Sequence, residues 1–142
     1  SSFDEAIENF KQFIKMQPNH SRAHFGLGNA MMMKGQLDLA MLEYRVSGKL
    51  DSTFALPYMN MANIQMQIKN IPAAIENYKK ALQIKPDMFA VHLSLGMIYY
   101  QFKNDAPKAL GYLKDTLRLS PTQPGAARIK SLIVELENKQ PA

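Results

Sequence analysis

The sequence predicts an all-α protein built of antiparallel helix pairs, and three observations support this. An alanine recurs at intervals of 34, 34 and 35 residues, at Ala6, Ala40, Ala74 and Ala109. A second series recurs every 34 residues, at Leu27, Met61 and Leu95, and a small residue follows each member. Around both series, apolar residues are spaced three and four apart, which is the period of an amphipathic helix. Two helices in each repeat predict an α-solenoid, in which every repeat packs on its neighbours.

The predicted elements are a lone helix, three helix pairs and a final helix. We expect one domain over 1–142, divided into 1–20 (second helix of a truncated repeat), the repeats 21–54, 55–88 and 89–123, and a capping helix over 124–138. Pro72 and Pro107 stand at predicted helix starts, where the missing N–H is tolerated. Gly35 falls in the turn inside the first pair, and the third repeat carries one extra residue around 104–105.

The two ends of the predicted array differ from each other. The last helix carries one apolar stripe, at Ile129, Leu132, Ile133 and Leu136, as a solvating cap requires. Ser1 falls in a predicted turn between two helices, so the first helix of the first pair is missing. We therefore expect a fragment of a longer array, whose upstream part was removed or is supplied by another molecule. Phe10 and Phe13 would then lack part of their cover.

Composition limits the class of protein. The hydrophobic fraction of 46% is sufficient for a packed core, and the net charge of +5 is scattered along the chain. The absence of cysteine excludes disulfides and thiolate chemistry. No apolar stretch reaches the 18 or so residues that a membrane-spanning helix needs. We expect a cytoplasmic protein, and this composition leaves a periplasmic location open as an alternative.

The combined spacing of Leu-Gly, alanine, aromatic residue and proline in a 34-residue helix–turn–helix resembles the tetratricopeptide repeat (TPR) family. The resemblance covers nearly the whole chain and implies a right-handed α-solenoid, or superhelix, that acts as a protein–protein interaction scaffold. There are departures from the family pattern. His24, Tyr58 and His92 stand where the family commonly has tryptophan, and Ser52 replaces the usual proline of the first complete repeat.

The resemblance also implies that the first helices of successive pairs line a concave groove. At helical spacing, the inner positions of these helices are apolar or amide side chains, and none is charged. The predicted peptide groove consists of Phe25, Asn29, Met32, Met33, Met59, Asn60, Asn63, Met66, Gln67, Leu93, Met97, Tyr100 and Gln101.

The chemistry of these side chains favours a peptide ligand. Methionine is unbranched and polarizable and accepts varied apolar side chains. Asparagine carries both a donor and an acceptor, so Asn29 and Asn63 are expected to pair with an extended peptide backbone. A clamp for acidic C-terminal tails is disfavoured, because residues 89–102 contain no lysine or arginine.

Self-occupation is the alternative that the sequence leaves open. The missing helix, a tail or a neighbouring copy would then lie in the groove, or a copy would pack on the open N-terminal face. The second helices carry most of the basic residues, and this side is read as a solvated face. Binding of an acidic protein, anionic lipid or RNA through it is the weaker reading.

Catalysis and metal binding are not expected. His24 and His92 occupy equivalent positions two repeats apart and are read as packing residues. No nucleophile–base set, phosphate loop or convergent ligand cluster is present in the sequence. We therefore expect no enzyme activity, no cofactor and no metal, with a protein or peptide as the partner.

Overall fold

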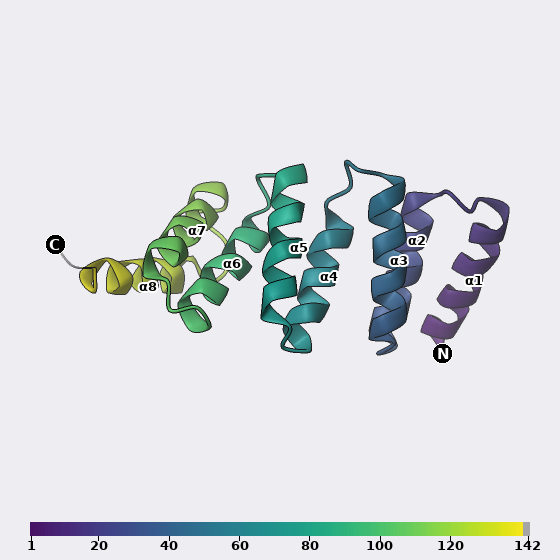
Figure 1. Cartoon of the computed structure of the whole chain (residues 1–142), viewed down its shortest axis with the longest axis horizontal. Coiled ribbons are helices and arrows are strands. Elements are labelled where there is room, and N and C mark those ends of the chain that lie inside the picture. The colour runs from purple at the N-terminus through teal and green to yellow at the C-terminus, as the bar shows by residue number, and fades with distance from the viewer. Residues whose placement is uncertain (141–142) are drawn as a thin grey trace. The chain divides into compact units, whose positions relative to one another are not determined.

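The computed structural model describes residues 1–140, which form eight helices and no strand (Figure 1). The helices are α1 (Ser2–Met16), α2 (Ser21–Met33), α3 (Leu37–Leu50), α4 (Leu56–Gln67), α5 (Ile71–Ile84), α6 (Phe89–Gln101), α7 (Ala106–Leu119) and α8 (Ala126–Asn138). The predicted all-α class is confirmed over these residues. The helices fall into two compact units, Ser1–Lys85 and Pro86 onwards, and each unit is described by itself.

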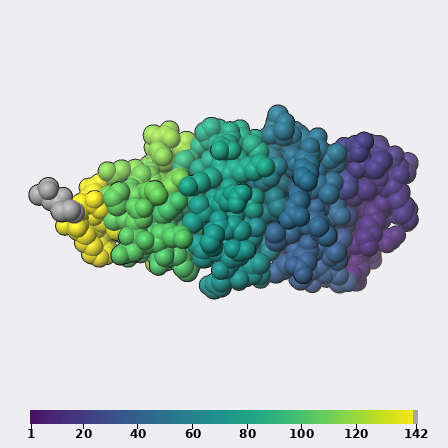
Figure 2. All heavy atoms as spheres, in the orientation of Figure 1, coloured from purple at the N-terminus to yellow at the C-terminus, as the bar shows by residue number. Residues whose placement is uncertain are grey.

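Unit 1 contains two complete helix pairs and the lone helix α1. Helix α2 pairs with α3 and α4 with α5, while α1 packs on α2 and α3 on α4. Figure 1 shows α3 in front of α2, so the space-filling view of the same side shows the second helix of this pair (Figure 2). The recurring alanines Ala40 and Ala74 are fully buried. The aromatic residues four positions later, Tyr44 and Tyr78, are also buried.

Small residues set the distance between paired helices. A Cβ atom added to Gly28 would lie 2.8 Å from the Tyr44 ring and 3.3 Å from the carbonyl oxygen of Ala40. In unit 2, a Cβ atom on Gly96 would lie 2.9 Å from the Leu113 side chain. Contacts this short require the neighbour to move, so a larger residue would overpack the pair. Both glycines therefore face the bulky residue one turn after the recurring alanine, and Gly28 also faces the alanine itself.

The turn inside each pair contains one residue in the left-handed conformation. Gly35 has a φ of 81°, Lys69 a φ of 64° and Asn104 a φ of 49°. Glycine adopts this region without a penalty, and asparagine tolerates it better than most residues. Lysine has neither advantage, so the second turn holds a backbone conformation that its sequence disfavours. The extra residue of the third repeat lies in the third turn, which runs over 102–105 between α6 and α7.

Unit 2 contains the pair α6–α7 and the final helix α8. The apolar stripe of α8 points inward, because Ile129, Ile133 and Leu136 are buried and Leu132 is half-buried. Gly125 precedes α8 with a φ of 89°, which ends the incoming loop and starts the helix at Ala126. Helix α8 thus covers the end of the α6–α7 pair.

We predict that Lys69→Gly stabilises the protein. Glycine at a φ of 64° relieves a strain of roughly 1 kcal/mol, and a gain of about 0.5–1 kcal/mol is expected in urea unfolding. The matched control is Gly35→Ala, because it introduces a Cβ at a φ of 81° and should be destabilising. Equal stability of both variants and the parent chain would contradict this account of the turns.

Candidate functional site

The thirteen predicted groove residues are all accessible. They lie on α2, α4 and α6, the first helices of the three pairs. Nine are half-buried and four are exposed, and the exposed members are Met33, Asn63, Gln67 and Gln101. Nine of the thirteen belong to unit 1 and four to unit 2. Accessibility is a necessary condition for the predicted site, and every residue meets it.

Asn29 forms the centre of a hydrogen-bond network in unit 1. The buried hydroxyl of Tyr44 donates to Asn29 Oδ1 over 2.6 Å, and Asn60 Nδ2 donates to the same oxygen over 3.1 Å. Burial raises the pKa of the Tyr44 phenol, which keeps it protonated and able to donate. The network joins α2, α3 and α4. The side-chain oxygen of Asn29 therefore already accepts two hydrogen bonds from within the chain.

Asn63 repeats this arrangement with one difference. The Tyr78 hydroxyl donates to Asn63 Oδ1 over 2.5 Å. Asn63 is exposed, and within residues 1–140 its Nδ2 group makes no hydrogen bond. Two N–H donors of Asn63 thus face solvent on α4, where an acceptor such as a peptide carbonyl can reach them.

The three consecutive methionines of α2 occupy three different environments. Met31 is buried in the core of unit 1. Met32 is half-buried, and its sulfur lies 3.6 Å from the Tyr44 hydroxyl. Met33 is 61% exposed. The run therefore passes from core to surface within one turn of helix, which leaves the last two side chains accessible.

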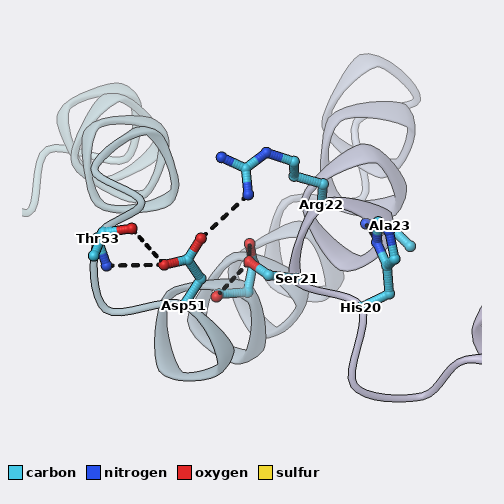
Figure 3. Close-up of polar contacts among 7 residues, drawn as sticks. His20, Ser21, Arg22, Ala23, Asp51 and Thr53 are labelled. Carbon is cyan, nitrogen blue, oxygen red and sulfur yellow. Dashed lines mark hydrogen bonds and ion pairs between the residues drawn. The ribbon is translucent and has the colours of Figure 1, made fainter.

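Arg22, near the N-terminus of α2, is a cationic residue whose charge is paired within unit 1. Arg22 Nη1 lies 3.2 Å from Asp51 Oδ2 (Figure 3). The Arg22 guanidinium also stacks 4.5 Å from the centroid of the Phe54 ring. Hydrogen bonds from Thr53, together with Arg22, hold the pKa of Asp51 below its usual value. The Phe54 ring also packs on Phe25, with centroids 4.9 Å apart. Arg22 is therefore committed to a partner within the chain.

Unit 2 contains a cavity of about 580 Å³ between α6 and α8. Four of its lining residues are the predicted groove residues of α6, and the others come from α8 and the loop before it. The lining residues are Leu93, Met97, Tyr100, Gln101, Pro124, Gly125, Arg128, Ile129, Ser131, Leu132 and Glu135. Sequence reasoning missed the contribution of α8, because its apolar stripe was assigned to capping alone. The width of that stripe, which includes both Ile129 and Leu132, was the available signal.

A second cavity, of about 490 Å³, lies in unit 1 against α1. Its lining residues are Ala6, Asn9, Phe10, Phe13, His20, Arg22 and Ala23. Phe13 is 38% exposed, whereas the residues at the equivalent position of α3, α5 and α7 are fully buried. Those residues are Ser47, Ala81 and Thr116. Helix α1 therefore presents to solvent the surface that the other second helices bury.

The equivalent histidines serve the fold. The ring nitrogens of His24 lie 2.7 Å from Glu43 Oε2 and 2.7 Å from the Pro18 carbonyl oxygen. His92 Nε2 lies 2.8 Å from the carbonyl oxygen of Pro86. Over residues 1–140, no group of three or more potential metal ligands converges. A search of the same residues for a helix long and apolar enough to cross a membrane finds none.

Comparison with known proteins identifies the family. A profile described as "Tetratricopeptide repeat" matches residues 1–48, and one described as "TPR repeat" matches residues 62–101. The chain belongs to the tetratricopeptide repeat family. TPR proteins are generally non-enzymatic scaffolds that bind protein partners, and the TPR repeats of this chain support a role as a protein–protein interaction scaffold.

Similar structures establish the fold of this TPR chain. The crystal structure of MamA matches with a TM-score of 0.80 at 24% identity, covering 96% of this chain and 77% of MamA. The Cut9 and Hcn1 hetero-tetramer structure of the APC/C matches with a TM-score of 0.74 at 21% identity, covering 97% of this chain and 27% of the matched one. Both likenesses support the predicted TPR solenoid fold.

One curated relative is similar in sequence. Protein CTR9 homolog of Arabidopsis thaliana is 25% identical over 108 residues, which are 73% of this chain. The matched region spans 10% of the length of that protein.

We predict that Asn29→Ala destabilises the fold by about 1–2 kcal/mol in urea unfolding, because the buried Tyr44 hydroxyl loses its oxygen acceptor. Adding Tyr44→Phe should then cost little more, since no buried hydroxyl is left unpaired. Gln67→Ala is the control, because Gln67 is exposed and should change stability by less than about 0.5 kcal/mol. A full additive loss in the double variant would show that the hydrogen bond is unimportant.

Proposed function

We propose that this TPR chain binds a peptide segment of a partner protein on the exposed faces of its first helices. The cavity of about 580 Å³ beside α6 is the observation that carries the proposal. Its size lies within the range typical of ligand pockets, and four of the predicted residues line it. Met97 and Leu93 supply an apolar floor, while Tyr100 and Gln101 supply polar groups.

In unit 1, the accessible side chains of α4 support the same function through a different combination of groups. Met59 and Met66 are half-buried, so part of each apolar side chain packs on the protein and part remains accessible. Asn63 adds two N–H donors that suit the carbonyl groups of an extended chain. Apolar contacts with methionine tolerate varied side chains, while amide donors fix the path of the backbone.

The test uses peptides selected from a phage-displayed random library on the full chain and then synthesised with a fluorophore. Met97→Glu should weaken the binding of pocket-directed peptides at least about tenfold, because a charge replaces an apolar side chain in the cavity. Fluorescence polarisation measures the dissociation constants.

Val134→Glu is the matched control for this variant. Val134 is an apolar residue of α8 that is 55% exposed and does not line the cavity. Circular dichroism should show unchanged helicity for both variants. Peptide binding that survives Met97→Glu and Val134→Glu equally would contradict the proposal.

Self-association through α1 is a second candidate, favoured by the cavity of about 490 Å³ on that helix. Phe10 and Phe13 lie at positions where the other second helices bury side chains. A helix with small and apolar residues on one side would fit this surface, and a second copy carries such helices. An exposed apolar surface of this kind is typical of an interaction site.

If copies associate in this way, the mass from light scattering should rise with concentration over a roughly hundredfold range. Phe13→Glu should abolish the rise, because it places a charge in the cavity. Met16→Glu, at a position 81% exposed and outside the cavity, should not. A constant monomer mass for the parent chain would eliminate this candidate.

A further inference from the structure

We infer that the cavity between α6 and α8 selects a partner segment in which an aspartate or glutamate stands next to an apolar side chain. The inference rests on the proposed peptide-binding function and specifies the ligand of that site. It depends on the charges at the cavity, on their spacing and on the apolar surface between them.

Within residues 1–140, one charged side chain of the cavity lining has no ion-pair partner, and that side chain is positive. Two of its lining residues belong to the charged residue types, Arg128 and Glu135. Glu135 Oε1 accepts a hydrogen bond from Lys139 Nζ over 2.7 Å, so its charge is compensated on the same helix. This hydrogen bond also raises the pKa of Lys139, which keeps the lysine charged. Arg128 has no carboxylate partner within residues 1–140.

The other cavity provides an internal comparison. Arg22 lines the cavity against α1, but Asp51 compensates its charge over 3.2 Å. A guanidinium forms two parallel hydrogen bonds with a carboxylate, and Arg128 retains this capacity for a ligand. Charge complementarity at the α6–α8 cavity therefore favours an anionic group, and the cavity against α1 lacks this preference.

The spacing of the charged residues gives the cavity two distinct ends. Arg128 and Glu135 are seven residues apart, so they are separated by about 10 Å along the helix axis. Leu132 lies between them, and Leu93 and Met97 line the cavity from α6. An apolar side chain placed on this surface therefore brings a neighbouring acidic residue within reach of Arg128.

The polar residues of α6 favour a side-chain carboxylate over the carboxylate of a chain terminus. Tyr100 and Gln101 also line the cavity and offer a hydroxyl and an amide to a continuing backbone. A segment that passes through the cavity can use these groups and Arg128 together. A peptide whose terminal carboxylate binds Arg128 would have backbone on only one side of that contact to pair with Tyr100 and Gln101.

The experiment titrates the full chain, labelled at the methionine methyl groups, with two peptide amides. The acetylated sequences are Ser-Gly-Phe-Glu-Gly-Ser and Ser-Gly-Phe-Gln-Gly-Ser, which differ in charge and hardly in shape. The shift of the Met97 methyl signal reports binding in the cavity, and buried Met31 and exposed Met16 serve as internal references.

The glutamate peptide should bind about threefold to tenfold more tightly than the glutamine peptide, and added salt should reduce this ratio. Arg128→Gln should bring the ratio close to one. Lys130→Gln, which removes a neighbouring charge that does not line the cavity, should leave the ratio unchanged.

Three results would overturn the inference, and they separate it from the function on which it rests. Equal binding of both peptides at Met97 in the parent chain removes the preference for a carboxylate and leaves peptide binding standing. A ratio that persists in Arg128→Gln assigns the preference to another residue. The absence of a Met97 shift with either peptide removes both the inference and the proposed function of this cavity.

Discussion

A Cβ atom on Gly28 would lie 2.8 Å from the Tyr44 ring, and one on Gly96 would lie 2.9 Å from Leu113. This close approach of paired helices is the constraint on which the other features depend. It brings a bulky side chain of the second helix across the first helix. Where that side chain is a tyrosine, its hydroxyl reaches the residue after the small position of the first helix. The same contact that fills the core therefore determines which groups remain available on the opposite face.

The residue type after each small position of the first helix matches the bulky residue of the second helix that packs there. Tyr44 donates to Asn29, and Tyr78 donates to Asn63. In the third repeat, leucine replaces the tyrosine at Leu113 and methionine replaces the asparagine at Met97. A hydrogen-bonded pair has thus been exchanged for an apolar pair, which avoids an unsatisfied buried hydroxyl. The exchange makes the α6 face apolar at the position where the larger cavity lies.

Much of the fold could be predicted from the sequence because the repeat consists of residue types that are selected by local geometry. Periodic alanines, small residues and prolines at helix starts respond to packing and capping that each repeat meets in the same way. The conformation of Lys69 could not be predicted in this way, since backbone hydrogen bonds that close the turn hold this exposed residue at a φ of 64° against its own preference. The role of Asn29 also escaped it, because a polar residue at an accessible position reads equally well as a ligand group or as a partner for a buried tyrosine.

Helix α8 shows why the site was harder to predict than the fold. Its stripe caps the α6–α7 pair through Ile133 and Leu136, and the edge of that stripe continues into the cavity through Leu132. Capping and binding thus draw on one apolar surface, and periodicity cannot divide it between them. The apolar surface would supply most of the affinity for a ligand, since a bound ligand would remove it from water. Arg128 is exposed and screened by salt, so its contribution would lie in choosing among apolar segments.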